Sequence, residues 1–206
     1  MRITAEFSGL AIESLYAKLE GVCEDGPAVF ARELNAAGER LRAKTVVAEA
    51  KQSGLSNGTL DRAQQTIPAE PGRLIFTTLV HGGNVRLKYF NAREGGGGVT
   101  ADPWDESRFY PGAFVTSGRA PGRAPAAQLN LQVYTPLKGG KRPTSYKRKG
   151  KNISPGTWWR KIQVDRSGLF LPTELTRGET ARAFEAGAPL ELKDLLTEII
   201  DMLEEQ

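Results

Sequence analysis

Residues that commonly bind metals or act as catalytic bases are scarce in this sequence. Its 206 residues include one cysteine, Cys23, and one histidine, His81. A single cysteine excludes a disulfide within the chain and is typical of a protein in a reducing compartment. A zinc site or a Ser-His-Asp arrangement would have to use His81, and the glycines that follow it predict an exposed turn. The sequence therefore gives no positive reason to expect an enzyme, a metal or a cofactor.

Long apolar runs are missing as well. No stretch reaches the roughly 18 apolar residues that a membrane-spanning helix needs, so we expect no membrane partner. The first residues, Met1 to Glu6, have no apolar core of the length found in secretory signals. The four glycines from Gly95 to Gly98 predict a flexible loop. They do not indicate a phosphate-binding loop, because the Lys and Ser/Thr that complete that motif do not follow them. With 39% hydrophobic and 25% charged residues, the composition is globular.

Acidic and basic residues are unevenly distributed along the chain. Residues 1–70 carry 8 basic and 10 acidic side chains, residues 71–166 carry 17 and 5, and residues 167–206 carry 3 and 9. The net charge of +4 therefore combines a strongly basic middle with an acidic C-terminal segment. Such asymmetry is typical of proteins that bind a polyanion or assemble through complementary charges on neighbouring subunits.

Apolar periodicity predicts helices in the N-terminal third of the chain. A short amphipathic helix is expected over residues 11–19 and a third helix over residues 59–65. Between them a long helix is expected, with Pro27 in its first turn, an apolar stripe that starts at Phe30, and an end near Ser53. Gly54 should end the long helix, because glycine readily adopts the left-handed conformation of a C-terminal cap.

The middle of the chain changes to the residue types and spacing of β-strands. Residues 73–80 and 85–90 flank a glycine-containing connection and predict a β-hairpin. Further strands are expected over residues 112–116, 128–134 and 158–164. The alternation within residues 128–134 predicts that Leu129, Leu131 and Val133 face a core.

A long basic loop is predicted between Pro136 and Pro155. It carries seven cations and no acid: Lys138, Lys141, Arg142, Lys147, Arg148, Lys149 and Lys151. Clustered cations suit a nucleic-acid backbone, to which they bind through counterion release with little sequence preference. The other interpretation is a solvated loop or a contact with an acidic neighbouring subunit, because no known DNA- or RNA-binding motif accompanies the run.

The C-terminal segment is predicted to be helical again. Thr176 to Glu179 matches a capping box, so a helix should begin there and end at Gly187. A last helix follows, and its apolar residues share one face: Leu192, Leu195, Leu196, Ile199, Ile200 and Leu203. Such a stripe either packs in the core or contacts another subunit. The candidate subunit-contact residues are Leu195, Leu196, Ile199 and Ile200.

Three acidic residues surround Trp104 and are the candidates for acid–base or metal chemistry. Asp102, Asp105 and Glu106 could hold a divalent cation through oxygen ligands, as a metal-dependent nuclease requires. They lack the spacing of a calcium-binding loop, and a polar turn with a half-buried tryptophan explains the same residues.

These patterns together predict the fold class. We expect a single α+β domain over residues 1–206, in which an antiparallel β-sheet within residues 71–166 is flanked by helices from residues 1–70 and 167–206. Neither helical end has enough apolar surface to fold alone, which favours one domain over two.

Six short segments, in this order, give the sequence a resemblance to a known family. They are FARELNAA at 30–37, AKQSGL at 50–55, VRLKYFNAR at 85–93, GVTA at 98–101, PGAFV at 111–115 and LFLP at 169–172. In this order they resemble the lambda-like minor tail protein Z family of long-tailed bacteriophages. The resemblance covers roughly residues 28–200 and excludes the basic loop, which looks like a local elaboration.

The resemblance implies a structural protein of the virion that completes the tail and connects it to the DNA-filled head. It implies no catalytic residue and no cofactor. The expected partners are further copies of the chain in a ring, other tail or neck proteins, and genomic DNA, with assembly in the host cytoplasm. Two alternatives from other classes remain: a cytoplasmic DNA-binding accessory protein without sequence preference, and the metal-dependent nuclease.

Overall fold

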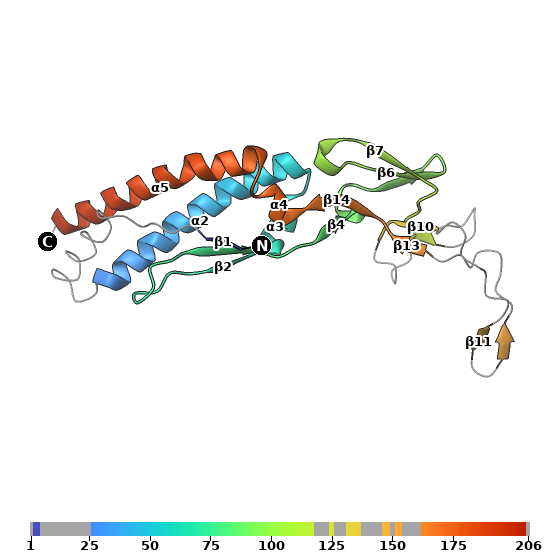
Figure 1. The fold of residues 1–206 in the computed structure, drawn as a ribbon, viewed down its shortest axis with the longest axis horizontal. Helices are drawn as coiled ribbons and strands as arrows, with labels where there is room; N and C mark the ends of the chain where they lie inside the picture. Colours follow the sequence, from blue (N-terminus) through green and yellow to red (C-terminus); the bar gives the residue numbers. More distant parts are fainter. Residues whose placement is uncertain are drawn as a thin grey trace. The chain divides into compact units, whose positions relative to one another are not determined.

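The computed structural model describes residues 2–4, 26–117, 124–125, 131–136, 146–148, 151–153 and 162–204, and it confirms the α+β class. The chain divides into two compact units (Figure 1). Unit 1 comprises residues 1–83 and 169–206, and unit 2 comprises residues 84–168. The single domain over residues 1–206 stays a prediction. The helix expected over residues 11–19 lies outside the described residues.

Unit 1 is built on two long helices, α2 (Gly26–Ser53) and α5 (Gly178–Glu204). Helix α2 confirms the long helix predicted with Pro27 in its first turn and an end near Ser53. At 1.5 Å per residue, each helix is roughly 40 Å long. Gly54, with φ of 75°, follows α2 in the left-handed conformation expected of its cap. The helices run antiparallel in Figure 1, and their side chains share one core.

The helix break predicted at Gly187 is wrong, because α5 continues through this residue and through Pro189. Gly187 is buried, and a Cβ atom there would lie 2.8 Å from Leu41 Cδ1 of α2. The glycine therefore permits close approach of the two helices, a role that its sequence neighbourhood does not distinguish from a cap.

The predicted capping box does not form either. Thr176 Oγ1 donates a hydrogen bond to the Thr173 carbonyl (3.1 Å), and Glu179 forms an ion pair with Arg182 (2.6 Å). The helix begins two residues later, at Gly178, so both side chains of the motif are bound elsewhere. A short helix, α4 (Leu171–Glu174), precedes it.

A three-stranded antiparallel sheet completes unit 1, in the order β1 (Arg2–Thr4), β3 (Thr77–Val80), β2 (Gln64–Ile67). Helix α3 (Asn57–Ala63) leads directly into β2. The helix predicted over residues 59–65 therefore starts and ends two residues too late, because Gln64 and Gln65 belong to β2 and pair with β3.

The β-hairpin predicted from residues 73–80 and 85–90 is wrong. Strand β3 pairs with β1 and β2, whereas β4 (Asn84–Arg86) pairs with β14 (Arg166–Phe170). Strand β3 thus pairs with two strands that precede it, and β4 pairs with a strand far away in the sequence. The residues after β4 form a 3-10 turn, η1 (Leu87–Tyr89), in place of a continuing strand.

The core of unit 1 lies where α2, α5 and the chain entering β3 meet. Its buried residues are Phe30, Leu34, Ala37, Ala69, Phe76, Leu195 and Ile199. Gly38 brings α2 close to this core, because a Cβ at that position would lie 2.4 Å from a ring atom of Phe76.

Unit 2 contains short antiparallel ladders, where the sequence predicted one larger sheet. The three-stranded ladder is β5 (Arg93–Gly95), β6 (Gly98–Ala101) and β7 (Arg108–Pro111). The two-stranded ladders pair β8 (Thr116–Ser117) with β9 (Ala124–Pro125), β10 (Tyr134–Pro136) with β13 (Ile162–Val164), and β11 (Tyr146–Arg148) with β12 (Lys151–Ile153). Buried side chains of unit 2 include Leu87, Phe90, Val99, Ala101 and Val133.

Three predictions in unit 2 need correction. The predicted basic loop contains the paired strands β11 and β12, so part of it is a β-hairpin. Gly96 and Gly97, with φ of 60° and 83°, form the tight turn between β5 and β6, where a flexible loop was expected. Leu131 is 54% exposed in a left-handed turn conformation, whereas Val133 is buried as predicted. Of the expected strand 158–164, residues 158–161 lie outside the described residues.

Candidate functional site: assembly surfaces and a pocket

A buried carboxylate joins the two long helices at mid-length. Glu191 of α5 is 2% exposed and accepts hydrogen bonds from Arg40 Nε (2.7 Å) and Lys44 Nζ (2.6 Å) of α2. Burial alone raises the pKa of Glu191, but the bonds and charges of the two cations outweigh it, so the pKa is lowered. The carboxylate stays charged and fixes the register of α2 against α5.

A glutamine fixes the end of the helix pair where α2 stops and α5 starts. Gln52, in the last turn of α2, accepts a hydrogen bond from the Thr180 backbone N–H (3.1 Å) and donates to Glu174 Oε2 (2.8 Å). It thereby satisfies an N–H in the first turn of α5 that has no partner within the helix. Gly178, with φ of 62°, lets the glutamine approach, because a Cβ there would lie 2.5 Å from Gln52 Oε1.

A second buried carboxylate has no cation beside it among the residues that the structure describes. Glu49 of α2 is fully buried, and its Oε2 accepts a hydrogen bond from Gln64 Nε2 (3.0 Å). Among the described residues, no donor reaches Glu49 Oε1 or Gln64 Oε1. Burial is the main cause that raises the pKa of Glu49 to about 7. The negative charge of Glu174 also raises this pKa, whereas the hydrogen bond from Gln64 lowers it.

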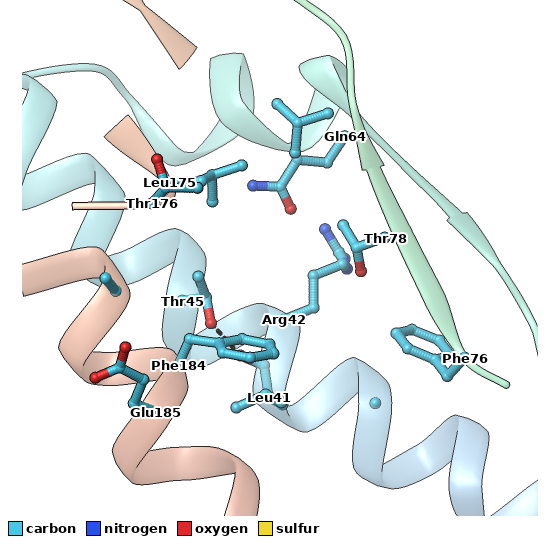
Figure 2. A pocket seen from close by; sticks show the side chains of 13 residues that line it. Leu41, Arg42, Thr45, Gln64, Phe76, Thr78, Leu175, Thr176, Phe184 and Glu185 are labelled. Carbon is cyan, nitrogen blue, oxygen red and sulfur yellow. Dashed lines mark hydrogen bonds between the residues drawn. The ribbon is translucent and has the colours of Figure 1, made fainter. Parts of the chain in front are cut away.

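Unit 1 also contains a pocket of about 270 Å³ between α2, α5 and strands β2 and β3 (Figure 2). Its walls are mainly apolar and include Leu41, Phe76 and Phe184. Figure 2 shows the side-chain oxygen of Gln64 and the guanidinium of Arg42 pointing into this space. The Arg42 guanidinium is held by Glu39 (2.7 Å) and Asp61 (3.0 Å), which raise its pKa.

The apolar stripe of the last helix has two parts. Leu195 and Ile199 are fully buried in the core of unit 1, which confirms the core interpretation for them. Leu196 is partly buried against this core. Ile200, which follows the buried Ile199, is 43% exposed, so the core interpretation is wrong for this residue. Its role as a subunit contact stays a prediction.

The seven candidate nucleic-acid-binding residues are described in part. Lys147 and Arg148 lie in β11 and Lys151 lies in β12, where Lys147 pairs in register with Asn152. The remaining four lie outside the described residues: Lys138, Lys141, Arg142 and Lys149.

The charge asymmetry of the sequence follows the boundary between the two units. Unit 2 contains sixteen Lys and Arg against five Asp and Glu, and unit 1 contains twelve against nineteen. The net charges are therefore +11 and −7. Within unit 2, residues 118–161 hold eleven of the cations and no acid. In unit 1, exposed acids lie along α5, among them Glu179, Asp194 and Asp201.

The acidic residues around Trp104 do not converge on one point. Glu106 forms an ion pair with Arg108 (2.8 Å), whose guanidinium also lies 4.8 Å from the Trp104 ring centroid. Asp102 accepts a hydrogen bond from Asn91. Within the described ranges, no three His, Cys, Asp or Glu side chains are grouped closely enough to hold a metal ion. His81 is exposed, as predicted.

Sequence reasoning missed Glu49, Gln64 and the pocket. One signal was present: Glu49 lies four residues after Thr45 and eight after Leu41, on the buried stripe of α2. The position of Gln64 gave no signal, because the glutamine was assigned to the end of a helix.

The comparisons with known proteins give no relative. No protein-family model, curated protein or solved structure matches this chain. None of the helices in the described part of the chain is long and apolar enough to cross a membrane. The candidate sites therefore rest on the geometry and charge of the chain itself.

Proposed function

We propose that this chain is a structural subunit that completes the tail of a long-tailed bacteriophage and connects it to the head. The observation that carries the proposal is the separation of charge into a unit of +11 and a unit of −7. A contact between the basic unit of one copy and the acidic unit of the next is heterologous, and such contacts form a ring when the rotation between successive copies closes. The resemblance of the six ordered segments to the minor tail protein Z family supports the same function.

The outer surface of α5 supplies the acidic side of the proposed contact. Its exposed acids accompany two exposed apolar side chains, Leu190 (58% exposed) and Ile200 (43% exposed). Exposed charges steer the approach of a partner, and apolar side chains contribute most where they become fully buried. The Glu191 ion pairs and the Gln52 contacts hold α5 rigidly on α2, so this surface is already formed before a partner binds.

The salt dependence of self-association tests the ring contact. The purified full chain should associate at low ionic strength and dissociate as salt is added, because exposed charges are screened over roughly 10 Å at 0.1 M salt. Sedimentation velocity at several salt concentrations measures this. A protein that stays monomeric at every salt concentration, or an oligomer whose stability ignores salt, argues against the contact.

Location in the particle tests the function itself. Mass spectrometry of purified virions should find the chain at a fixed copy number per particle, consistent with one closed ring. Its absence from particles, together with its presence in the soluble fraction of infected cells, would favour the accessory-protein alternative.

Direct DNA contact is the second candidate function, favoured by the eleven cations without an acid in residues 118–161. Changing Lys147, Arg148 and Lys149 to glutamate should abolish binding to duplexes of any sequence while self-association survives. For the unmutated protein, log affinity should fall with log salt at about −0.9 per phosphate neutralised.

A matched variant reverses three exposed cations of unit 1, Lys51, Arg62 and Lys193, and changes the net charge equally. It should keep its DNA affinity if the cations of unit 2 form the binding surface. If the unmutated protein never binds DNA and the unit 2 variant loses self-association, the basic segment is a protein contact.

A further inference from the structure

The pocket of unit 1 has a size that matches two fused rings. An apolar cavity of about 150 Å³ holds one benzene ring, and this pocket measures about 270 Å³. Leu41, Phe76, Val80 and Phe184 give it apolar walls of the kind that bind aromatic groups. Size and lining therefore favour a bicyclic aromatic guest over a single ring.

One wall carries a hydrogen-bond acceptor that the described residues leave unused. Gln64 Oε1 is buried and has no donor among them, although the amide nitrogen is fixed by its bond to Glu49. Leaving such a group unpaired costs free energy, which a guest with an N–H donor would recover. In Figure 2 this oxygen points toward the pocket, and a guest N–H would reach it once a neighbouring side chain of the wall shifts, because the oxygen itself is buried.

A cationic group forms another part of the wall. Glu39 and Asp61 fix the Arg42 guanidinium, and Figure 2 shows it pointing into the same space as the Gln64 oxygen. A fixed guanidinium is attracted to the face of an aromatic ring, most strongly to that of tryptophan. The guest that combines two fused rings, one N–H donor and an electron-rich face is an indole.

We propose that this pocket binds the indole of a tryptophan side chain presented by a partner protein. The pocket is partly open to solvent, with the exposed Glu185 among its lining residues, so a ring can enter while its backbone stays outside. The Arg42 guanidinium already donates its N–H groups to Glu39 and Asp61, so its contact with the guest is with the face of the indole ring. The site lies wholly within unit 1 and does not depend on the proposed tail function.

The test uses N-acetyl-tryptophan amide as the probe, titrated into the full chain and followed by amide NMR. Backbone signals of Val80 and Ala181 should shift in a saturable way. The 1-methyl derivative keeps the rings but lacks the N–H, and it should bind about tenfold more weakly because Gln64 Oε1 stays unpaired. The tyrosine and phenylalanine analogues, with one ring, should also bind more weakly.

A pocket-filling variant and a matched control locate the binding. Ala181→Phe places a ring inside the pocket and should reduce binding more than tenfold, whereas Ala186→Phe adds the same ring at an exposed position of α5 and should leave binding unchanged. Equal affinity for the tryptophan probe and its 1-methyl derivative overturns the proposal. So do tighter binding of the tyrosine analogue and the absence of saturable shifts. The comparison of ligands needs no variant, so it holds even if Ala181→Phe fails to fold.

Discussion

Replacing Glu49 by glutamine should remove a pH dependence from the stability of this protein. The folded chain holds this carboxyl fully buried beside the Gln64 amide, with no cation next to it in the described part of the chain, and its pKa rises from 4.5 to about 7. Between these values the folded protein keeps a proton that the unfolded chain has lost. The stabilisation is therefore fully present below about pH 4.5 and disappears as the pH rises through about 7.

The size of the effect follows from the shift in pKa. One unit corresponds to about 1.4 kcal/mol, so raising the pKa from 4.5 to about 7 makes the free energy of unfolding fall by about 3 kcal/mol across this range. Glutamine has nearly the same shape and cannot ionise. The Glu49→Gln variant should therefore gain about 3 kcal/mol relative to the unmutated protein between pH 4.5 and pH 8.

Urea denaturation followed by circular dichroism measures this at a series of pH values. Taking the difference between the two proteins at each pH cancels the contributions of all other titrating groups. Glu70→Gln serves as the control, because Glu70 is exposed and should give a difference that does not change with pH. If the unmutated protein and Glu49→Gln lose stability in parallel as the pH rises, Glu49 is charged in the fold and the reasoning fails.

Two further pairs of variants test the packing of unit 1, each by thermal denaturation of the full chain. Gly38→Ala should cost about 1–3 kcal/mol, because its Cβ would lie 2.4 Å from Phe76, whereas Gly58→Ala in α3 meets open space and should stabilise by up to about 1 kcal/mol. Equal effects of the two would refute the close approach of α2 to Phe76. Leu195→Ala should cost about 2–5 kcal/mol because Leu195 is fully buried, whereas Ile200→Ala should change stability by less than about 0.5 kcal/mol and weaken self-association. A large loss of stability in Ile200→Ala would place it in the core and remove it from the proposed contact.

Elements with a long local signal were predictable from the sequence, and those that depend on distant partners were not. Helix α2 follows its apolar stripe and its glycine cap closely. The expected hairpin failed because residues 77–80 find their partners in β1 and β2, which no local pattern reveals. Gly187 was misassigned because a glycine that permits helix packing has the same sequence appearance as one that ends a helix.

The candidate sites show the same division. Net charge is a sum over residues, so the basic middle and the acidic C-terminal segment could be identified from the sequence. Their location in two separate units could not. Burial depends on the whole fold. For Glu49, the only indication of burial in the sequence was its position on the apolar stripe of α2. The pocket joins residues from Gly38 to Glu185, and its polar wall depends on which way Gln64 turns, which no sequence pattern encodes.

Unit 1 is built from two stretches of the chain that are separated by unit 2, and this determines when it can fold during synthesis. Its core begins with Phe30 and Leu34 but is completed by Leu195 and Ile199, which the ribosome adds after all of unit 2. Until then α2 exposes the apolar face that α5 will cover, and an incomplete chain cannot bury it. A chain released early would therefore lack both a stable first unit and the acidic surface of α5. Only chains whose synthesis has passed α5 can therefore enter an assembly that uses this helix.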